Sequence, residues 1–360
     1  MNTHKALIAM SGGVDSSLAA KLMLDNGYQC IGCTMKLYNN EDACISKGHT
    51  CCSLDDVEDA RNVAATLGIP YHVFNFTDDF KQKIIDKFVR SYLCGMTPNP
   101  CIDCNRCMKF DKLYERAKLM GCDTIVTGHY ARIEFDETTG KYILKKAVDA
   151  TKDQSYVLYT LTQEQLAHTQ FPLGSKCKTE VRKLAEQFGF INADKPDSQD
   201  ICFVPNGDYA AVIEHHTGKK AVPGNFLTPD GKILGKHQGI IHYTIGQRRG
   251  LGLTYHKPLY VCKICPRDNT VILGQKSDLM ASECDVNDFN WISGEVPTGP
   301  LKCKAKIRYR NTEKPAVATP SGPDSVHITF DAPVEAITPG QAAVLYDGDI
   351  VLGGGTIIAK

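Results

Sequence analysis

The sequence predicts an α/β protein with a doubly wound parallel sheet, followed by a β-rich second half. The first two hundred residues alternate apolar, strand-like runs with helical segments, which is typical of parallel sheets. Past residue 205, glycine and proline become frequent and short alternating segments replace the helices. We expect a catalytic domain at 1–205, a small β-rich linking domain at 206–280 and a β-barrel at 281–360.

The first strand–helix unit carries the strongest motif. An apolar run at 6–10 predicts a buried strand, 18–24 predicts a helix that ends at Gly27, and Ser11-Gly12-Gly13-Val14-Asp15-Ser16-Ser17 connects them. Glycines let the backbone approach a phosphate, and the N–H groups and dipole of the helix start would hold it. The loop lacks the lysine of the common nucleotide loop. A helix entry capped by Ser or Asp, without any ligand, is the alternative.

The following elements continue the alternation. We expect strands at 30–37, 71–76 and 124–127, and helices at 54–67, 80–92 and 108–120, the first helix being capped by Ser53. Ligands of such sheets bind beyond the carboxyl ends of the strands. Ser11-Gly12-Gly13 and Gly128-His129-Tyr130 both fall at such ends. We therefore expect these two segments to border one site.

Neither the charge balance nor the start of the chain points to a particular partner or compartment. Among the 360 residues, 41 are basic and 41 acidic, so there is no overall basic signal for nucleic acid, although a local patch remains open. The start, Met1 to Lys5, leads into a strand too short for the apolar core of a signal peptide. No apolar run approaches the length that spans a membrane. We expect a cytoplasmic protein without a membrane partner.

Sixteen cysteines are many for such a protein. In a reducing compartment they act as core residues, metal ligands or catalytic thiols more often than as disulfides. Strand-like surroundings predict core positions for four of them: Cys30, Cys33, Cys122 and Cys303. A polar insertion holds Cys44, Cys51 and Cys52, and a strand-like run holds Cys262 and Cys265. We assign no role to these five.

Two further cysteine segments indicate chemistry. Thr97 to Cys107 contains two prolines, which predict a loop that enters the next helix. A helix start near Arg106 and Lys109 predicts a lowered thiol pKa for the cysteines there. The second segment, Asp197 to Pro205, contains Cys202 just before the change in composition.

Together these motifs resemble one family, the bacterial MnmA-type tRNA-specific 2-thiouridylases, which belong to the PP-loop ATP pyrophosphatases. The resemblance covers nearly the whole chain, and the order and spacing of its motifs are specific. They are Ser11–Ser17, Thr97-Pro98-Asn99-Pro100 with Cys104-Asn105, Thr127–Tyr130, Lys152–Ser155, Ile201-Cys202-Phe203, Gly246–Gly252, Arg308–Arg310, Thr338–Gln341 and Leu352–Gly355.

The resemblance implies an ATP-dependent sulfurtransferase. ATP, with Mg²⁺, would adenylate the C2 oxygen of the wobble uridine, position 34 of tRNA. Sulfur would then replace AMP to give 2-thiouridine. The implied partners are tRNAs of the Lys, Glu and Gln type and a sulfur donor, either a cysteine desulfurase or a relay protein. A cysteine persulfide can carry the sulfur, and a second cysteine can break its S–S bond.

Site residues follow from the resemblance motif by motif. Cys202 matches the persulfide-bearing cysteine and Cys104 the nucleophile, and the two would form a transient disulfide. Positions that match the ATP site are Ala9, Met10, Ser11, Gly12, Gly13, Val14, Asp15, Ser16, Met35 and Gly128. Positions that match contacts to tRNA are Asn99, Pro100, Cys101, His129, Lys152, Asp153, Gln154, Arg308, Tyr309 and Gln341. Read without the resemblance, 152–154 is an ordinary polar turn.

Cys101 departs from the family, since many members have Asp there. Cys101, Cys104 and Cys107 form Cys-x-x-Cys-x-x-Cys, a metal or iron–sulfur pattern. The resemblance to relatives with Cys-x-x-Cys here and a distant third cysteine implies a [4Fe–4S] cluster on Cys101, Cys104 and Cys202, whose free iron would bind sulfide and deliver it to the base. Zinc on three cysteines is a third alternative. The role of Cys107 stays open, as does the choice between persulfide and cluster.

Two rival functions remain. The first is another PP-loop enzyme that adenylates a small molecule, such as an amidotransferase, but the sequence contains no glutaminase domain and this reading leaves Cys104 and Cys202 unexplained. The second is a non-catalytic metal- or RNA-binding module that uses the β half and the cysteines. The intact nucleotide loop argues against it.

Overall fold

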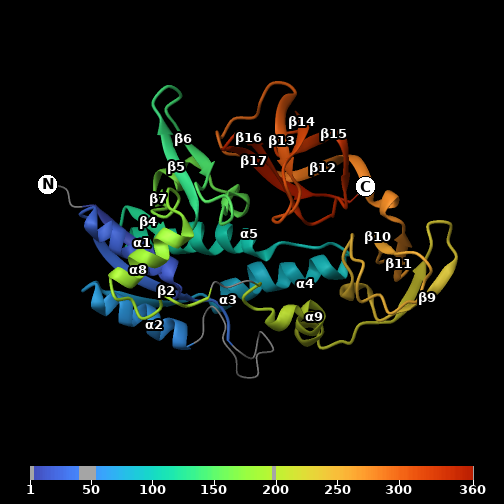
Figure 1. The fold of residues 1–360 in the computed structure, drawn as a ribbon, viewed down its shortest axis with the longest axis horizontal. Helices are drawn as coiled ribbons and strands as arrows, with labels where there is room; N and C mark the ends of the chain where they lie inside the picture. The colour runs from blue at the N-terminus through green and yellow to red at the C-terminus, as the bar shows by residue number, and fades with distance from the viewer. Residues whose placement is uncertain (1–3, 40–53, 197–199, 360) are drawn as a thin grey trace.

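The computed structural model describes residues 4–39, 54–196 and 200–359. Its first part contains a five-stranded parallel sheet in the order β3-β2-β1-β4-β7 (Figure 1). The strands are β1 (Lys5–Ala9), β2 (Gln29–Lys36), β3 (Tyr71–Asn75), β4 (Thr124–Thr127) and β7 (Thr169–Gln170). This confirms the predicted doubly wound α/β class. Strand order reverses beside β1, which is where such sheets bind ligands.

Helices cover this sheet. Near the nucleotide loop lie α1 (Val14–Asp25), α2 (Leu54–Thr66) and α8 (Lys178–Gln187). A longer helical run joins α3 (Thr77–Phe80), a π-helical stretch (Lys81–Ile85) and α4 (Asp86–Leu93). A second run joins α5 (Pro100–Cys104), a π-helical stretch (Asn105–Lys112) and α6 (Leu113–Leu119). Ser53, the expected cap of α2, lies outside the described residues.

The second helical run corrects the sequence prediction. We expected a loop up to Cys107 and a helix from residue 108, but the helix begins at Pro100. Proline is tolerated at the first helical position because its missing N–H has no intrahelical acceptor there. The Asn99 side chain caps the helix by accepting a hydrogen bond from the Cys101 N–H at 3.2 Å. Cys101 and Cys104 therefore lie on a helix.

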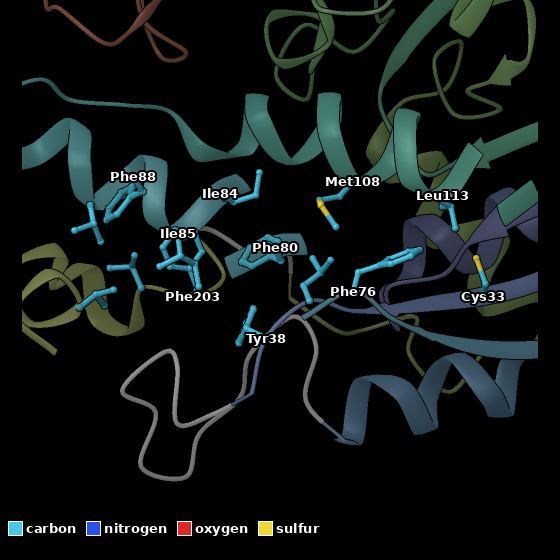
Figure 2. Close-up of a cluster of buried hydrophobic side chains, with 14 of the residues drawn as sticks. Cys33, Tyr38, Phe76, Phe80, Ile84, Ile85, Phe88, Met108, Leu113 and Phe203 are labelled. Atoms are coloured by element: carbon cyan, nitrogen blue, oxygen red, sulfur yellow. The ribbon is translucent and has the colours of Figure 1, made fainter. Parts of the chain in front are cut away.

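A buried cluster joins these helices to the sheet (Figure 2). Phe203 packs edge-on against Phe80 and Phe88, with ring centroids 5.7 and 5.2 Å apart. The cluster also takes in Leu7 and Cys33 from the two central strands and Met108 from the second helical run. Partly buried Cys104, Cys107 and Cys202 pack against it. One hydrophobic core thus holds both cysteine segments at the sheet.

The C-terminal part is the predicted barrel. Six antiparallel strands follow the order β12-β15-β14-β13-β16-β17, and pairing of β12 with β17 closes the ring. They are β12 (Met280–Trp291), β13 (Leu301–Lys306), β14 (Lys314–Pro320), β15 (Val326–Glu335), β16 (Ala342–Asp347) and β17 (Ile350–Ile357). A hairpin of β5 (Ala131–Asp136) and β6 (Lys141–Lys146), which the sequence prediction missed, extends this sheet from the first part of the chain.

The linking region carries α9 (Tyr209–Thr217) and a four-stranded sheet in the order β10-β11-β8-β9. Its strands are β8 (Gly224–Leu227), β9 (Ile233–His237), β10 (Tyr260–Cys265) and β11 (Thr270–Gly274). Phe226, Val261 and Val271 are among the residues of its separate small core. The remaining short helices are α7 (Gln163–Ala167) and 3₁₀ turns at Ser155–Leu158, Pro205–Gly207, Ile240–His242 and Lys276–Leu279. None of the helices in the described ranges is both long and apolar enough to cross a bilayer.

Candidate active site

The loop from Ser11 to Ser17 forms an open anion cradle. Ser16 Oγ accepts a hydrogen bond from the Ser11 N–H at 3.1 Å and donates to the Gly13 carbonyl at 3.0 Å. Gly13 is the N-cap of α1, and it has no side chain to bond the first N–H groups of that helix. Ser11 is exposed at the mouth of the cradle. The loop can therefore offer backbone N–H groups and the helix dipole to a phosphate.

Close packing requires glycine at Gly12. Its φ is +75°, and an added Cβ would lie 2.3 Å from the Asp56 carbonyl oxygen at the start of α2. The Gly12 carbonyl accepts a hydrogen bond from Asn192 Nδ2 at 3.0 Å. Lys195 bonds Asp56 and Asp59 at 2.6 Å each, which fixes the same corner. The sequence analysis missed both anchors, Asn192 and Lys195.

The structure places the other predicted nucleotide residues around this loop. Gly128, at the end of β4, approaches it so closely that a Cβ there would lie 2.8 Å from the Ser16 nitrogen. Met10 bonds to β2 through its carbonyl, which accepts from Thr34 Oγ1 at 2.6 Å. Met35 follows Thr34 in β2 and is partly buried. The expected set thus surrounds the carboxyl ends of β1, β2 and β4.

Asp15 has two partners that the sequence analysis also missed. Lys178, at the start of α8, donates to both carboxylate oxygens at 2.7 Å, and Tyr130 Oη donates to Oδ1 at 2.7 Å. Lys178 is buried but Asp15 is only partly buried, so this ion pair is partly shielded from water. The partners come from segments more than a hundred residues away in sequence. Local spacing holds no signal for such contacts.

The Cys104 thiol differs from the prediction. We expected a lowered pKa, but burial raises the pKa of Cys104 to about 11, an effect that nearby Lys109 only partly opposes. Cys101, Cys107 and Asp103 raise it further. Burial also raises the pKa of Cys107. The free-energy cost of taking the thiolate out of water is larger here than the stabilisation that the nearby cations and the helix start give it.

His129 is also placed differently from its expected tRNA-contacting role. It is only 7 % exposed, with Nδ1 2.6 Å from Thr127 Oγ1 and Nε2 3.4 Å from Lys109 Nζ. Burial, helped by the Lys109 charge, holds the pKa of His129 well below its usual range, so the ring stays neutral. His129 thus connects the end of β4 to the Cys104 helix, and its contact to tRNA stays a prediction.

Cys202 is held by its neighbours. Phe203 is fully buried in the aromatic cluster, and Tyr38, just past β2, donates from its hydroxyl to the Cys202 carbonyl at 2.6 Å. The preceding Asp197, Ser198 and Gln199 lie outside the described residues. Cys202 and Cys104 therefore share one hydrophobic support, beneath the ends of β1 and β2.

The expected metal ligands do not form a metal site. Across residues 4–39, 54–196 and 200–359, no three His, Cys, Asp or Glu side chains are grouped so that they could hold an ion. Cys101 is exposed on α5, whereas Cys104 faces the buried cluster. Cys101, Cys104 and Cys202 do not fit a [4Fe–4S] or zinc site in this arrangement, so we derive no step through either.

Residues 152–154 form a turn beside the barrel. Asp153 accepts hydrogen bonds from the backbone N–H groups of Ala147 and Ser155 at 3.0 and 3.2 Å, and Gln154 Oε1 accepts from the Tyr130 N–H at 2.9 Å. These two side chains maintain the turn. Lys152 is partly exposed there. Tyr309 is 39 % exposed, with its hydroxyl 3.4 Å from the Asp153 carbonyl.

Arg308 and Gln341, two expected tRNA contacts, are partly buried and form hydrogen bonds within the protein. Arg308 Nη2 donates to the carbonyls of Ile245 and Ala336 at 2.7 and 3.2 Å and also bonds Thr338 Oγ1. Gln341 Nε2 donates to the Thr97 carbonyl at 2.8 Å. Both side chains join the barrel to other parts of the chain.

The other cysteines fit structural positions. Cys30, Cys33 and Cys122 are buried as expected, and partly buried Cys303 packs against the barrel core. Cys262 and Cys265 lie on β10 and are partly buried. Cys44, Cys51 and Cys52 lie outside the described residues.

Known protein families and relatives match nearly the whole chain. Family models described as a tRNA methyl transferase HUP domain, a tRNA methyl transferase PRC-barrel domain and an aminomethyltransferase β-barrel domain match residues 4–206, 210–275 and 281–357. The tRNA-specific 2-thiouridylase MnmA of Clostridioides difficile is 52% identical over 353 residues, 98% of each chain. The protein of the same name from Acetivibrio thermocellus is 49% identical over 99% of this chain and 100% of its own.

Proposed function

Because the chain belongs to the tRNA-specific 2-thiouridylase family, we propose that it replaces the C2 oxygen of a wobble uridine in tRNA with sulfur at the expense of ATP. One observation carries the proposal furthest: an anion cradle and two cysteines gather at the carboxyl ends of one parallel sheet. A methyl transfer would need neither the cradle for pyrophosphate nor a pair of thiols.

Activation comes first. The uracil C2 oxygen leaves badly, so it attacks the α-phosphorus of ATP, pyrophosphate departs and the base becomes adenylated. ATP enters as its magnesium complex. The Ser11–Ser17 loop holds the departing phosphates through backbone N–H groups and the α1 dipole, and so stabilises the charge that develops there. Met35 and Gly128 border the nucleoside side of the site.

Sulfur transfer follows. The terminal sulfur of a Cys202 persulfide attacks C2, and AMP leaves. The Cys104 thiolate then attacks Cys202 Sγ, which breaks the S–S bond and leaves sulfur on C2 as a thione. The transferred sulfur is reduced by two electrons, and the two cysteines are oxidised to a Cys104–Cys202 disulfide. A thiol reductant restores both. The sulfur donor that reloads Cys202 is a desulfurase or a relay protein that carries a persulfide.

The target base would meet the start of α5. Asn99 and exposed Cys101 lie at this helix start. Tyr309 is 39 % exposed beside the barrel, and its hydroxyl lies 3.4 Å from the Asp153 carbonyl. Burial raises the pKa of Tyr309, and Asp153 and Cys101 raise it further. Lys152 adds a cation beside them. Aromatic and cationic side chains around an open surface suit an unpaired base and its phosphates, and we infer that a tRNA with a wobble uridine docks here.

The test measures pyrophosphate release from ATP and the 2-thiouridine content of a tRNA transcript by mass spectrometry. We expect release to require a transcript with uridine at the wobble position. Cys202→Ser and Cys104→Ser should abolish thiolation and the disulfide while ATP still binds. Cys107→Ser, one helical turn from Cys104, is the matched control and should keep thiolation.

Two results would contradict this proposal. Full thiolation by Cys202→Ser would remove the persulfide step. Pyrophosphate release that depends on a small metabolite and ignores tRNA would instead favour a different adenylating enzyme.

A further inference from the structure

Three segments that are distant in sequence meet at one place, here named the three-segment junction. They are residues 96–99, which lead into the Cys104 helix, residues 244–246 of the linking region, and residues 336–341 of the barrel. Each of the three parts of the chain contributes one segment. The junction lies outside the nucleotide cradle, and only its Asn99 also belongs to the proposed docking site of the target base.

The barrel segment binds the backbone of Thr97 on both sides. The Thr97 N–H donates to the Pro339 carbonyl at 2.9 Å, and the Thr97 carbonyl accepts from Gln341 Nε2 at 2.8 Å. Gly340 makes this approach possible: its φ is +88°, and an added Cβ would lie 3.0 Å from the Thr97 nitrogen. Thr97 Oγ1 also donates to Thr244 Oγ1 at 3.4 Å.

Arg308 connects the other two segments. A single nitrogen, Nη2, bonds the Ile245 carbonyl, the Ala336 carbonyl and Thr338 Oγ1. All three acceptors are neutral, and burial lowers the pKa of this guanidinium. Glu335 opposes this shift only as a smaller, longer-range contribution. A partly buried charge whose printed hydrogen bonds all go to neutral acceptors is costly. A function that depends on the fixed position of Arg308 would explain why a charged side chain is present here.

The path from Thr97 to the cysteines is short and stiff. Pro98 and Pro100 have fixed φ angles. Between them, Asn99 is held by its hydrogen bond from the Cys101 N–H. The helix that starts at Pro100 carries Cys101 and Cys104 within its five residues. A shift at Thr97 would therefore move the whole helix start and its thiols.

We propose that Gln341 and Arg308 are positioning residues for the start of the Cys104 helix relative to the RNA-docking surface of the β half. Gln341 acts directly on Thr97. Arg308 acts by holding the barrel segment 336–341, whose Pro339 carbonyl binds the Thr97 N–H. This inference rests on the proposed function. The contact of these two side chains to tRNA that the resemblance implies stays a separate prediction, which the experiment below also tests. An RNA seated on the barrel would thereby meet Cys104 at a fixed place.

The decisive variant is Gln341→Glu, which keeps size and shape but replaces the donor to the Thr97 carbonyl with a carboxylate. We expect kcat for thiolation to fall by about tenfold to a hundredfold, as misplaced reacting groups do. We expect KM and Kd for tRNA to stay within about twofold, because the hydrogen bond that is lost is the one to the Thr97 carbonyl. The rate at which iodoacetamide alkylates Cys104 without RNA should also change. Gln187→Glu, the same change on the exposed end of α8, should alter none of these.

Other outcomes overturn the inference. If Gln341→Glu raises KM and Kd for tRNA at unchanged kcat, Gln341 is an RNA contact. If kcat, KM, Kd and the alkylation rate all stay unchanged, Gln341 has neither a positioning nor a binding role. Should Gln341→Glu fail to fold, Arg308→Lys, which keeps the charge but loses the planar fork, takes its place with the same readouts. If the wild type does not thiolate tRNA, the proposed function falls, and the Cys104 alkylation rates alone decide on the junction.

Discussion

At the scale of single residues, the protonation of Cys104 distinguishes this site from one with a preformed thiolate. With a pKa of about 11, about one Cys104 side chain in ten thousand is ionised at pH 7. Attack on Cys202 needs the thiolate. We therefore expect bound RNA, or a change around the helix start, to favour ionisation during turnover.

The raised pKa gives a direct prediction for the RNA-free protein. Because the thiolate grows as pH rises toward about 11, alkylation of Cys104 by iodoacetamide should be slow at pH 7 and should still be accelerating above pH 9. Peptide mass spectrometry after timed labelling measures this rate. Cys177, which is exposed on the surface, provides the control and should label faster at pH 7. Rapid labelling of Cys104 at neutral pH would contradict the placement of its thiol.

At the scale of elements, the turn between β1 and α1 determines the nucleotide cradle. Gly12 and Gly27 flank the same helix, and both have positive φ, +75° and +82°. Gly12 faces a close neighbour, the backbone of α2, whereas no atom of the described part of the chain lies within 4 Å of a Cβ at Gly27. A substitution at Gly27 therefore measures the cost of backbone strain alone, and the same substitution at Gly12 measures strain together with steric overlap.

We predict that Gly27→Ala costs about 1 kcal/mol of unfolding free energy from its positive φ alone. Gly12→Ala should cost about 3 kcal/mol, because overlap with α2 adds to the strain, and it should also weaken ATP binding. Urea unfolding and calorimetric titration with ATP measure both quantities. Equal losses for the two variants would show that the contact with α2 does not shape the loop.

Sequence patterns predicted the elements better than the contacts between them. The β1–loop–α1 unit was predictable because apolar periodicity and glycine chemistry act within a few residues. The start of α5 was not, because Pro98 and Pro100 indicate a break while the Asn99 cap overrides it one residue later. The raised Cys104 pKa depends on burial beneath distant side chains. Lys178, the partner of Asp15, is 163 residues away in sequence.

At the scale of the whole molecule, the catalytic part and the barrel share a core. Tyr156, Leu158 and Phe110 pack in one buried cluster with Val344 and Tyr346 of the barrel. Tyr156 also donates from its hydroxyl to the Ala342 carbonyl at 2.8 Å. Two units that bury apolar surface against one another lose that stabilisation together.

The shared core predicts cooperative unfolding. Scanning calorimetry should show a single unfolding transition. Hydrogen exchange should show that the amides of β1, β4, β16 and β17 lose protection together. Tyr346→Ala should lower the unfolding temperature of both parts, because it removes a fully buried aromatic ring from the common core. Two well-separated transitions, one for the parallel sheet and one for the barrel, would contradict a common core.

The burial of Cys104 also bears on how long the protein survives oxidising conditions. Peroxide attacks thiolates that are open to solvent, and it converts them to sulfenic and then to irreversible sulfinic acids. A thiol that stays protonated against a hydrophobic cluster reacts slowly, while exposed Cys94 and Cys177 meet the oxidant first. The same environment that makes Cys104 a poor nucleophile at rest therefore preserves it between turnovers.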